Sequence, residues 1–181
     1  DKPDAIIVRS FNMHEYSLPE SVLAVSRAGA GTNNIPVADY AARGVVVFNT
    51  PGANANAVKE LVLASLLMSG RRIVDGIEWV KTLKGSEGLS KAVESGKKAY
   101  VGKEISEKTL GIIGLGAIGI LVANAAIDLG MSVVGVDPYL STANALRLNP
   151  AVRILPDTDA LLEASDFVTI HVPYNESTKY T

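Results

Sequence analysis

The 181-residue sequence contains no cysteine, and this absence excludes several kinds of protein at once. Disulfide-stapled secreted domains, zinc sites with thiolate ligands and cysteine nucleophiles all require the missing side chain. A reducing compartment fits a chain of this kind, and we expect a cytoplasmic protein.

The sequence also lacks a long hydrophobic run and an excess of either charge. Its longest largely apolar stretch, residues 61–70, is about half of the roughly 20 residues needed to cross a bilayer. The first residues, DKPD, do not resemble a signal peptide. Seventeen basic and nineteen acidic side chains give a net charge of −2, without a long block of one sign. Nucleic acids and membranes are therefore poor candidates for a partner.

What the sequence does contain is a repeated alternation of apolar strands and helices. In the first fifty residues, short apolar and mostly β-branched runs at 5–8, 22–25 and 45–48 predict strands. Pro36 opens a predicted helix over 36–43, and Gly44 ends it. Near-continuous apolar strands separated by helices predict a parallel sheet covered on both faces.

The sequence NTPGANAN at 49–56 interrupts this alternation and is predicted to be a hinge. A long helix is predicted over 57–72, and the Lys-, Gly-, Ser- and Glu-rich residues 81–103 are predicted to form a solvated connection with little core of its own. A second α/β unit begins at Thr109. Its predicted strands are 110–113, 132–136, 152–155 and 167–172, and its predicted helices are 117–129, 142–148 and 159–164.

The first strand and helix of this second unit are joined by three glycines in the pattern G-x-G-x-x-G. Gly114 would permit a tight turn, Gly116 would let the backbone approach a pyrophosphate, and Gly119 would let the helix pack closely on the strand. The anion would bind free N–H groups at the start of the helix. Asp137 ends the next strand, 18 positions after Gly119, where a carboxylate can bind both ribose hydroxyls and repels a 2′-phosphate. Because no arginine occurs between Asp137 and Arg147, the pattern favours NAD over NADP.

Other interpretations of the glycine pattern stay open at this point. The glycines could serve packing alone in a βαβ turn, with the acid as a solvated strand end. Proteins that bind S-adenosylmethionine or FAD also share a similar turn.

Beyond the glycines, six segments of the chain resemble the family of D-isomer-specific 2-hydroxyacid dehydrogenases. They run in family order over nearly the entire chain. The segments are IIVRS (6–10), SRAGAGTNNI (26–35), GVVVFNTPGANANAVKELVLA (44–64), KTLGIIGLGAIG (108–119), VVGVDPY (133–139) and SDFVTIHVP (165–173).

The resemblance implies an α/β fold, with a Rossmann-type doubly wound parallel sheet and part of a flavodoxin-like substrate domain. Residues 1–51 would form part of the substrate-binding domain, and residues 52–181 part of the NAD-binding domain, with a helical arm and linker over 52–103. The helix after NTPG would belong to the nucleotide domain and help to form a homodimer or a higher homo-oligomer.

The resemblance also implies roles for individual residues. Arg9 would face the anionic groups of the substrate, the N–H groups of Gly29 and Ala30 would meet its carboxylate, and Asn54 would lie in the cleft at the domain junction. The residues implied to contact NAD are Gly114, Gly116, Ala117, Ile118, Gly119, Asp137, Pro138, His171, Val172, Pro173 and Thr178. Two positions depart from the family pattern: Ala30, where Thr or Val is often found, and Glu107, where Gly is usual.

Hydride transfer from a 2-hydroxy acid needs a base, a cation to polarise the oxygen and a cofactor held nearby. In the family these protein groups are an arginine, a glutamate and a histidine that follow the fourth strand of the nucleotide domain, so the resemblance implies that they lie beyond Thr181. Neither His14 nor His171 matches the catalytic histidine, and we assign no catalytic residue to the chain. His14 does not begin an H-E-x-x-H motif because position 18 is leucine, and no metal site is predicted. The chain is therefore expected to be the middle of a longer enzyme.

The resemblance implies an NAD-dependent oxidoreductase that acts on a small anionic 2-hydroxy acid. The expected reaction is the oxidation of 3-phosphoglycerate to 3-phosphohydroxypyruvate, which leads into serine synthesis, because a forked guanidinium at Arg9 suits a substrate with two anionic ends. Another D-2-hydroxyacid dehydrogenase, acting on lactate, glycerate or hydroxyisocaproate, is one alternative. A second is an NAD-gated binding protein, like the transcriptional corepressors that keep this fold.

Overall fold

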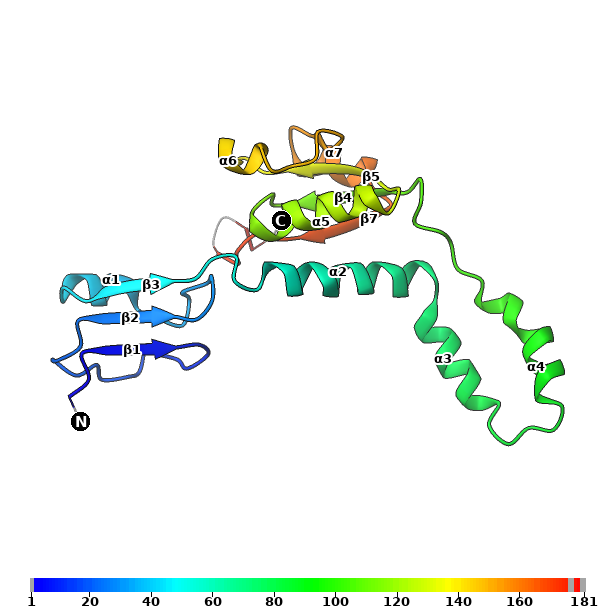
Figure 1. The fold of residues 1–181 in the computed structure, drawn as a ribbon, viewed down its shortest axis with the longest axis horizontal. Helices are drawn as coiled ribbons and strands as arrows, with labels where there is room; N and C mark the ends of the chain where they lie inside the picture. Colours follow the sequence, from blue (N-terminus) through cyan, green and yellow to red (C-terminus); the bar gives the residue numbers. More distant parts are fainter. Residues whose placement is uncertain (1, 176–177, 180–181) are drawn as a thin grey trace. The chain divides into compact units, whose positions relative to one another are not determined.

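The computed structural model describes residues 2–175 and 178–179 of the chain. The chain divides into two compact units, Asp1–Asn56 and Ala57–Thr181. Each unit contains one sheet of parallel strands, with α1 packed against the first sheet and several helices packed against the second (Figure 1). The predicted α/β fold with parallel sheets is therefore confirmed. The prediction that the sheet of the first fifty residues is covered on both faces is wrong for the described chain, because Ile7 is 81% exposed and Phe48 is 55% exposed.

The first unit has three parallel strands in the order β1-β2-β3. The strands are β1 (Ala5–Val8), β2 (Ala24–Arg27) and β3 (Val46–Asn49), and helix α1 (Val37–Ala42) joins β2 to β3. Strand β1 has the predicted bounds, whereas β2 begins two residues later than predicted. Val22 is buried, but its N–H closes a turn onto the carbonyl of Pro19 at 3.2 Å. A turn residue that points into the core thus gives the same sequence pattern as a strand residue.

Helix α1 begins and ends where the sequence indicates. Pro36 is its N-cap and Arg43 its C-cap, and Gly44 follows with a φ of +75°, a conformation that glycine adopts without strain. Eight buried side chains of this unit form one core: Val8, Met13, Leu18, Val22, Val25, Ile35, Tyr40 and Val45.

The second unit has four parallel strands in the order β6-β5-β4-β7. The strands are β4 (Thr109–Ile113), β5 (Ser132–Val136), β6 (Arg153–Ile154) and β7 (Phe167–Ile170), and the helices are α5 (Ala117–Asp128), α6 (Thr142–Ala145) and α7 (Thr158–Ala164). Counted along the chain, this is the order 3-2-1-4 with which the Rossmann fold begins. All the predicted strands and helices of this unit are present, although β6, β7 and α6 are shorter than predicted.

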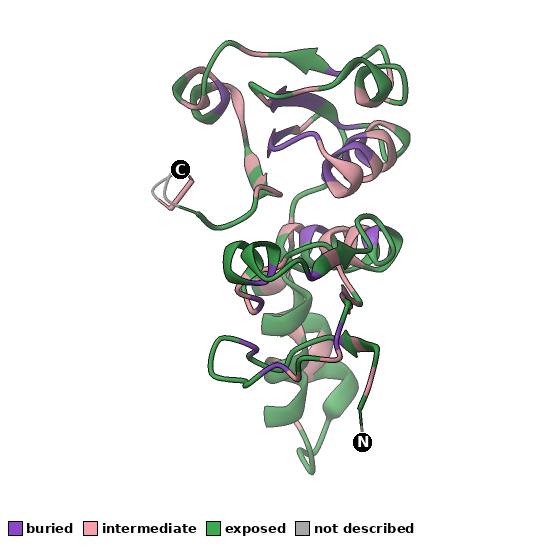
Figure 2. Cartoon of the chain, turned by 90° about the vertical axis from the view of Figure 1, so that its left-hand side faces the viewer, coloured by how far each residue is buried: buried purple, intermediate pink, exposed green. Residues whose placement is uncertain are grey.

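The sheet of the second unit is buried on both faces. Successive side chains of its central strands point to opposite faces, and each face is covered by a helix. Leu110 and Ile112 of β4 pack on one face with helix α5, whereas Ile113 packs on the other face with Leu161 of α7. Figure 2 shows the buried residues of this unit in purple, gathered in the strands and in α5. This two-sided burial explains why the strands read as continuous apolar runs in the sequence.

Residues 52–103 are more helical than the sequence predicts. They form α2 (Ala55–Gly70), α3 (Ile73–Thr82), α4 (Leu89–Gly96) and the 3₁₀ turn η1 (Lys97–Tyr100). The residues of 81–103 are exposed or partly exposed, which agrees with the predicted solvated connection with little core, but the prediction missed α4 and η1, which an aromatic contact fastens to α3. The rings of Trp79 and Tyr100 stack with 4.8 Å between centroids and an interplanar angle of 18°. Trp79 also lies so close to Gly96 that a Cβ there would collide with the indole ring.

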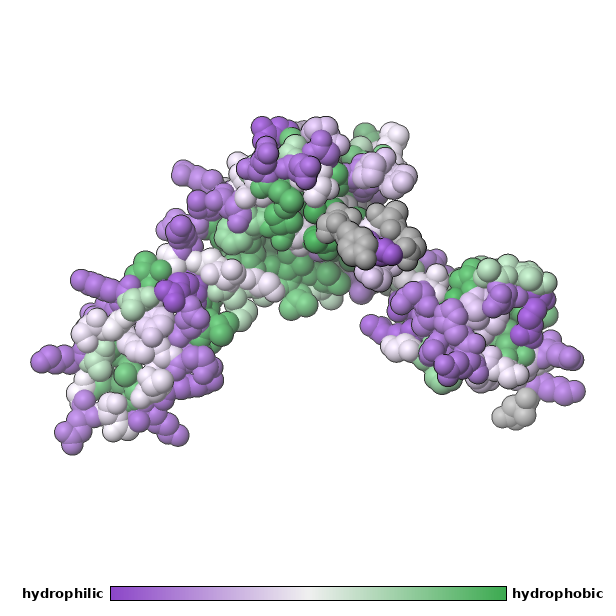
Figure 3. Space-filling model, turned by 180° about the vertical axis from the view of Figure 1, so that it is seen from behind, coloured by the Kyte–Doolittle hydropathy of each residue, from purple (hydrophilic) through white to green (hydrophobic). Residues whose placement is uncertain are grey.

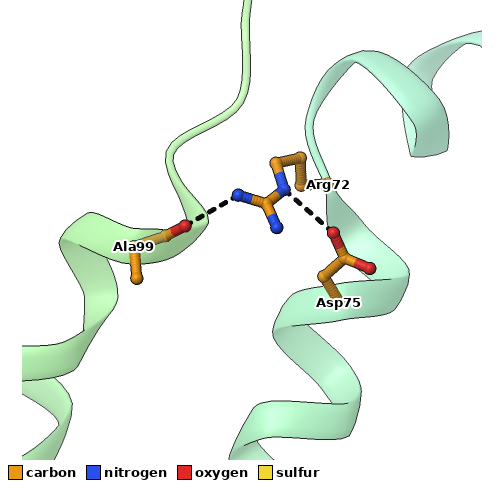
Figure 4. A network of polar contacts seen from close by, with 3 residues as sticks. All are labelled: Arg72, Asp75 and Ala99. Carbon is orange, nitrogen blue, oxygen red and sulfur yellow. Dashed lines mark hydrogen bonds and ion pairs between the residues drawn. The ribbon is translucent and has the colours of Figure 1, made fainter.

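A guanidinium joins the start of α3 to the end of η1 (Figure 4). Arg72 Nε donates to Asp75 Oδ2 at 2.9 Å, and its Nη1 donates to the carbonyl of Ala99 at 2.8 Å. The guanidinium carbon lies 5.6 Å from the centre of the Tyr100 ring. Exposed contacts of these types contribute at most about 1 kcal/mol each. They therefore fix the geometry of the segment more than its stability.

Helix α2 packs on the second unit with only part of its surface. Leu66 belongs to the same buried cluster as Ile105 and Leu110, whereas Leu61 is 68% exposed. Figure 3 shows hydrophobic residues at the surface of this unit in green. The exposed large apolar side chains of α2 and α3 are Leu61, Leu67, Met68, Ile73, Val74, Ile77 and Val80. None of the helices in the described part of the chain is long and apolar enough to span a membrane.

Candidate cofactor-binding site

A cavity of about 690 Å³ lies at the carboxyl edge of the second unit's sheet. In parallel α/β sheets, ligands bind outside the carboxyl ends of the strands, where the strand order reverses. Here the order reverses between β4 and β7. The residues that line the cavity are Ile113, Gly114, Gly116, Val136, Asp137, Pro138, Tyr139, Asn144, Leu155, Pro156, Asp157, Thr158, His171, Val172, Pro173, Asn175 and Thr178.

The turn between β4 and α5 contains three glycines in three different settings. Gly114 has a φ of +94°, and a Cβ there would lie 2.8 Å from Cγ1 of Val172, so the turn touches the loop after β7. Gly119 is buried, and a Cβ there would collide with the carbonyl oxygen of Gly114. At Gly116, which lines the cavity, a Cβ would meet nothing within 4 Å. Two of the glycines thus allow close packing, and the third leaves open space beside the backbone.

Helix α5 begins directly after this turn, and no side chain caps it at Gly116. The first N–H groups of a helix have no partner within the helix, and they carry the positive end of its dipole. A diphosphate can bind such a helix start. Of the residues predicted to contact NAD, Ala117, Ile118 and Gly119 do not line the cavity, and they form the first turn of the helix behind it.

Asp137 directly follows β5, and both of its carboxylate oxygens accept hydrogen bonds from the backbone. Oδ2 accepts from the N–H of Leu115 in the glycine turn at 2.8 Å, and Oδ1 accepts from the N–H of Tyr139 at 2.8 Å. A carboxylate has about four lone-pair positions, so each oxygen can accept a further hydrogen bond. The acid therefore orients the glycine turn and keeps acceptors for a ligand. The sequence predicts the acid but not its bond to Leu115.

His171 begins the loop after β7. Its N–H donates to the carbonyl of Ile113 at 2.7 Å, and its Nε2 lies 3.0 Å from Oγ1 of Thr169. Burial lowers the pKa of His171 below its usual value, so the imidazole is neutral near pH 7. The imidazole ring of His171 thus offers hydrogen-bonding groups to the cavity without a positive charge.

The remaining predicted contacts of NAD, namely Pro138, Val172, Pro173 and Thr178, also line the cavity. The Thr178 hydroxyl donates to the carbonyl of Pro173, which closes this loop on itself. The structure therefore brings these four residues together with the glycine turn, Asp137 and His171.

The cavity is also lined by residues that were not predicted from the sequence: Ile113, Val136, Tyr139, Asn144, Leu155, Pro156, Asp157, Thr158 and Asn175. Residues 155–158 follow β6, so their place directly after a strand was the signal that could have found them. Asn144 lies on α6, and its Nδ2 donates to the carbonyl of Leu115 at 3.4 Å. No sequence pattern marks that contact.

In the first unit, Arg9, Gly29 and Ala30 lie at the carboxyl edge of the sheet, after β1 and β2. The guanidinium of Arg9 is exposed and makes no hydrogen bond or ion pair with any residue that the structure describes. The N–H of Gly29 donates to the carbonyl of Arg27 at 2.8 Å. Among the described residues, the N–H of Ala30 has no such partner. Asn54 is exposed in the turn before α2.

Asn34 holds the stretch of chain that carries Arg9. Its Nδ2 donates to the carbonyl of Arg9 at 3.3 Å and to the carbonyl of Phe11 at 2.8 Å. The side chain thereby ties the loop after β1 to the loop after β2. Sequence reasoning missed Asn34, because its role depends on contacts between residues more than twenty positions apart.

No group of three or more His, Cys, Asp or Glu side chains is placed to hold a metal ion in the part of the chain that the structure describes. His14 lies in the first unit, and its Nε2 is 3.0 Å from the carbonyl of Asn33. The polar side chains that line the cavity carry carboxylates, amides, hydroxyls and one neutral imidazole.

The chain is similar to known proteins over nearly all of its length. Residues 63–181 match the family model described as D-isomer specific 2-hydroxyacid dehydrogenase, NAD binding domain. The hydroxypyruvate reductase of Thermotoga maritima is 36% identical over 180 residues, which cover 98% of this chain and 54% of that protein. A D-3-phosphoglycerate dehydrogenase of Synechocystis is 33% identical over 178 residues, which cover 97% of this chain and 30% of that protein.

A similar fold occurs in a solved structure of the NAD⁺-bound 3-phosphoglycerate dehydrogenase of Entamoeba histolytica. The two chains superpose with a TM-score of 0.70 and 29% identity, over 97% of this chain and 48% of the other. The chain thus spans about half the length of the first relative, and less than a third of the second.

Proposed function

Because the chain belongs to the family of D-isomer-specific 2-hydroxyacid dehydrogenases, we propose that the protein oxidises 3-phosphoglycerate to 3-phosphohydroxypyruvate with NAD as the hydride acceptor. The family match confirms the resemblance seen in the sequence, and its NAD-binding domain confirms the predicted cofactor. The observation that supports NAD as the cofactor is the cavity in which a hydrogen bond joins the glycine turn to the carboxylate of Asp137, and the choice of substrate rests on the similarity to a D-3-phosphoglycerate dehydrogenase.

The fit of this cavity to NAD rests on its glycines and its acid. The open space at Gly116 allows a diphosphate to approach the backbone, where the first N–H groups of α5 supply donors. Asp137 keeps a lone pair on each oxygen for the two hydroxyls of a ribose. When bound, NAD supplies the ring that accepts the hydride. The chain's own groups bind and orient it, and His171, Val172 and Pro173 enclose it.

We propose that the first unit belongs to the substrate-binding domain, and that Arg9 binds an anionic group of the substrate. A guanidinium forms paired hydrogen bonds with a carboxylate or phosphate, and that of Arg9 is exposed at the carboxyl edge of the sheet. Asn34 fixes the backbone of this arginine, and the N–H of Ala30 offers a further donor. Gly29 and Asn54 are assigned to the same site from the family resemblance.

The exposed apolar side chains of α2 and α3 support a homodimer, since patches of this kind often mark interfaces. Leu61 is 68% exposed and Val80 is 54% exposed. We propose that a second copy of the chain covers them, and that the protein works in the cytoplasm, in keeping with its lack of cysteine. Light scattering should give the mass of a dimer, and Leu61→Asp combined with Val80→Asp should shift it toward the monomer. An unchanged mass in the double variant would contradict this role for α2 and α3.

A substrate panel tests the proposed reaction in the full-length protein. We expect kcat/KM with NAD to be higher for 3-phosphoglycerate than for lactate, glycerate or hydroxyisocaproate. Arg9→Ala should raise the KM for 3-phosphoglycerate more than it lowers kcat, because a guanidinium that binds a remote anion contributes to binding. A higher kcat/KM for an unphosphorylated acid, or an unchanged KM in the variant, would contradict the proposal.

Hydroxypyruvate reduction is the second candidate, favoured by the 36% identity to the Thermotoga maritima hydroxypyruvate reductase. Hydroxypyruvate has one anionic group instead of two. If it is the substrate, kcat/KM with NADH should be higher for hydroxypyruvate than for 3-phosphohydroxypyruvate. The same assay, run in both directions, therefore separates the two candidates.

A further inference from the structure

Two acidic residues line the same side of the cofactor cavity. Strands β5 and β6 are neighbours, with Gly135 paired to Ile154, and the N–H of Leu155 donates to the carbonyl of Gly135 at 2.9 Å. The two strands thus leave the sheet side by side. Asp137 directly follows β5 and Asp157 lies three residues after β6, and both line the cavity.

Asp157 is held in place by the helix that it precedes. It is the N-cap of α7, and its Oδ1 accepts a hydrogen bond from the N–H of Ala160 at 2.8 Å. Asparagine and aspartate serve about equally well as N-caps. The helix therefore requires the acceptor oxygen at this position and not its negative charge.

No cation balances these two acids among the described residues that line the cavity. Those residues include no lysine or arginine. His171 adds no charge near pH 7, because burial lowers its pKa. Arg147 and Arg153 lie in the same part of the sequence but do not line the cavity. The net charge of the described side chains that line the cavity, Asp137 and Asp157 included, is therefore negative.

We propose that Asp157 is a second specificity-determining residue which, together with Asp137, excludes dinucleotides that carry a 2′-phosphate on the adenosine ribose. This role rests on the proposed function, since it takes Asp137 as the residue that binds the ribose. A phosphate monoester carries a charge of about −1.5 to −2 at neutral pH. At a distance of about two strand spacings, and with the dielectric constant of water, repulsion between this phosphate and one carboxylate raises the Kd of the phosphorylated dinucleotide about fourfold. Asp157 therefore adds a measurable preference to that of Asp137.

The test compares Asp157→Asn with Asp159→Asn. The first variant removes the charge and keeps the cap. The second removes a charge from the first turn of the same helix, at an exposed residue that does not line the cavity. NADH and NADPH are titrated by fluorescence against the purified full-length protein at low ionic strength, where charges are least screened. We expect Asp157→Asn to lower the Kd for NADPH about fourfold while the Kd for NADH stays within about twofold. Asp159→Asn should leave the ratio of the two Kd values unchanged.

Three results separate this role from other effects. An equal shift of both Kd values in Asp157→Asn would overturn the proposal, because it would indicate a structural change and not a charge selectivity. An equal effect of Asp157→Asn and Asp159→Asn would also overturn it, because net charge alone would then explain the shift. In about 1 M salt, where the Debye length is about 3 Å, the gain in NADPH affinity should shrink, and its persistence would contradict an electrostatic origin.

The proposed function can fail independently of this role. If the unaltered protein does not bind NADH, the proposed function is wrong, and the role of Asp157 with it. If NADH binds but Asp157→Asn leaves the ratio of the Kd values unchanged, only the role of Asp157 is refuted.

Discussion

Replacing Asp137 with alanine should weaken both the fold of the second unit and its cofactor site. The carboxylate accepts hydrogen bonds of 2.8 Å from the N–H groups of Leu115 and Tyr139. The bond to Leu115 is partly buried, so its N–H would lose its partner at a cost of about 1–3 kcal/mol. Tyr139 is exposed, and its N–H can turn to water. We therefore expect the free energy of unfolding to fall by about 1–3 kcal/mol.

The same substitution removes the acceptors for two ribose hydroxyls. A hydrogen bond to a charged group contributes about 1.5–3 kcal/mol, and about 1.4 kcal/mol corresponds to a tenfold change in Kd. We therefore expect the Kd for NADH to rise at least about tenfold. Fluorescence titration measures the Kd, and urea denaturation measures the free energy of unfolding. Glu163→Ala, at an exposed acid on α7, changes the net charge equally and serves as the control.

Two results would refute this reasoning. If Asp137→Ala binds NADH within about twofold of the unaltered protein, the ribose does not bind at this acid, and the adenosine end of the site is wrongly placed. If the affinity falls but the free energy of unfolding does not, the bond to Leu115 contributes nothing to the fold. For Asp137→Asn we expect a Kd for NADH and a free energy of unfolding between those of Asp137→Ala and the unaltered protein. Asparagine keeps one acceptor oxygen but turns an NH₂ group toward the other backbone donor.

Three further predictions concern the glycine turn, the sheet and the first unit. Gly116→Ala should leave the urea midpoint unchanged and raise the Kd for NADH, because the added Cβ enters the open cavity. Gly119→Ala should lower the urea midpoint, because the added Cβ meets a carbonyl oxygen. A backbone N–H and a lysine ammonium hold the pKa of Asp166 below its usual value. The stability that this carboxylate contributes should therefore be present above its unfolded-state pKa of about 3.9 and be lost as the pH falls through the lower folded-state pKa. When urea midpoints are measured from about pH 5 to about pH 2, the Asp166→Asn variant should lose less stability than the unaltered protein. Equal losses in the two proteins would contradict this prediction. Asn34→Ala should raise the KM for the substrate with little change in kcat, because Asn34 acts through Arg9. For the same reason, adding Asn34→Ala to Arg9→Ala should raise the KM little further. Additive effects on the KM in the double variant would show that Asn34 acts elsewhere.

The strands of the second unit could be predicted because their burial leaves a local trace in the sequence. Ile112 has no exposed surface, and Val134 is 2% exposed, so both faces of the central strands require apolar residues. The helix over 89–96 left no such trace. Its residues are exposed or partly exposed, and the segment is fastened by the stacking of Trp79 on Tyr100, two residues 21 positions apart. A contact of that range cannot be read from local composition.

The cofactor site divides in a similar way. The glycines and Asp137 could be predicted, because a tight turn, a close backbone approach and an acid at a strand end each require a particular residue type. Asn144 could not be predicted as part of the site, and the only sequence signal for Asp157 is its place shortly after a strand. Asp157 reaches the cavity because β6 lies beside β5, and Asn144 reaches it because α6 lies over the glycine turn. Strand order and helix placement are properties of the assembled sheet, and no single segment contains them.

Asp137 and Asp157 differ as positions at which cofactor preference could be changed, because only Asp137 holds the backbone of the glycine turn at Leu115. The N–H of Leu115 is held by Asp137 at 2.8 Å, and its carbonyl lies 3.4 Å from the Nδ2 of Asn144. A substitution at Asp137 therefore disturbs the turn on which the diphosphate of any dinucleotide depends, with or without a 2′-phosphate. Asp157 is tied instead to the N–H of Ala160 in α7, a bond that asparagine can also make. Charge can thus be removed at Asp157 without loosening the glycine turn, so preference between NADH and NADPH should change there at a smaller loss of overall affinity than at Asp137.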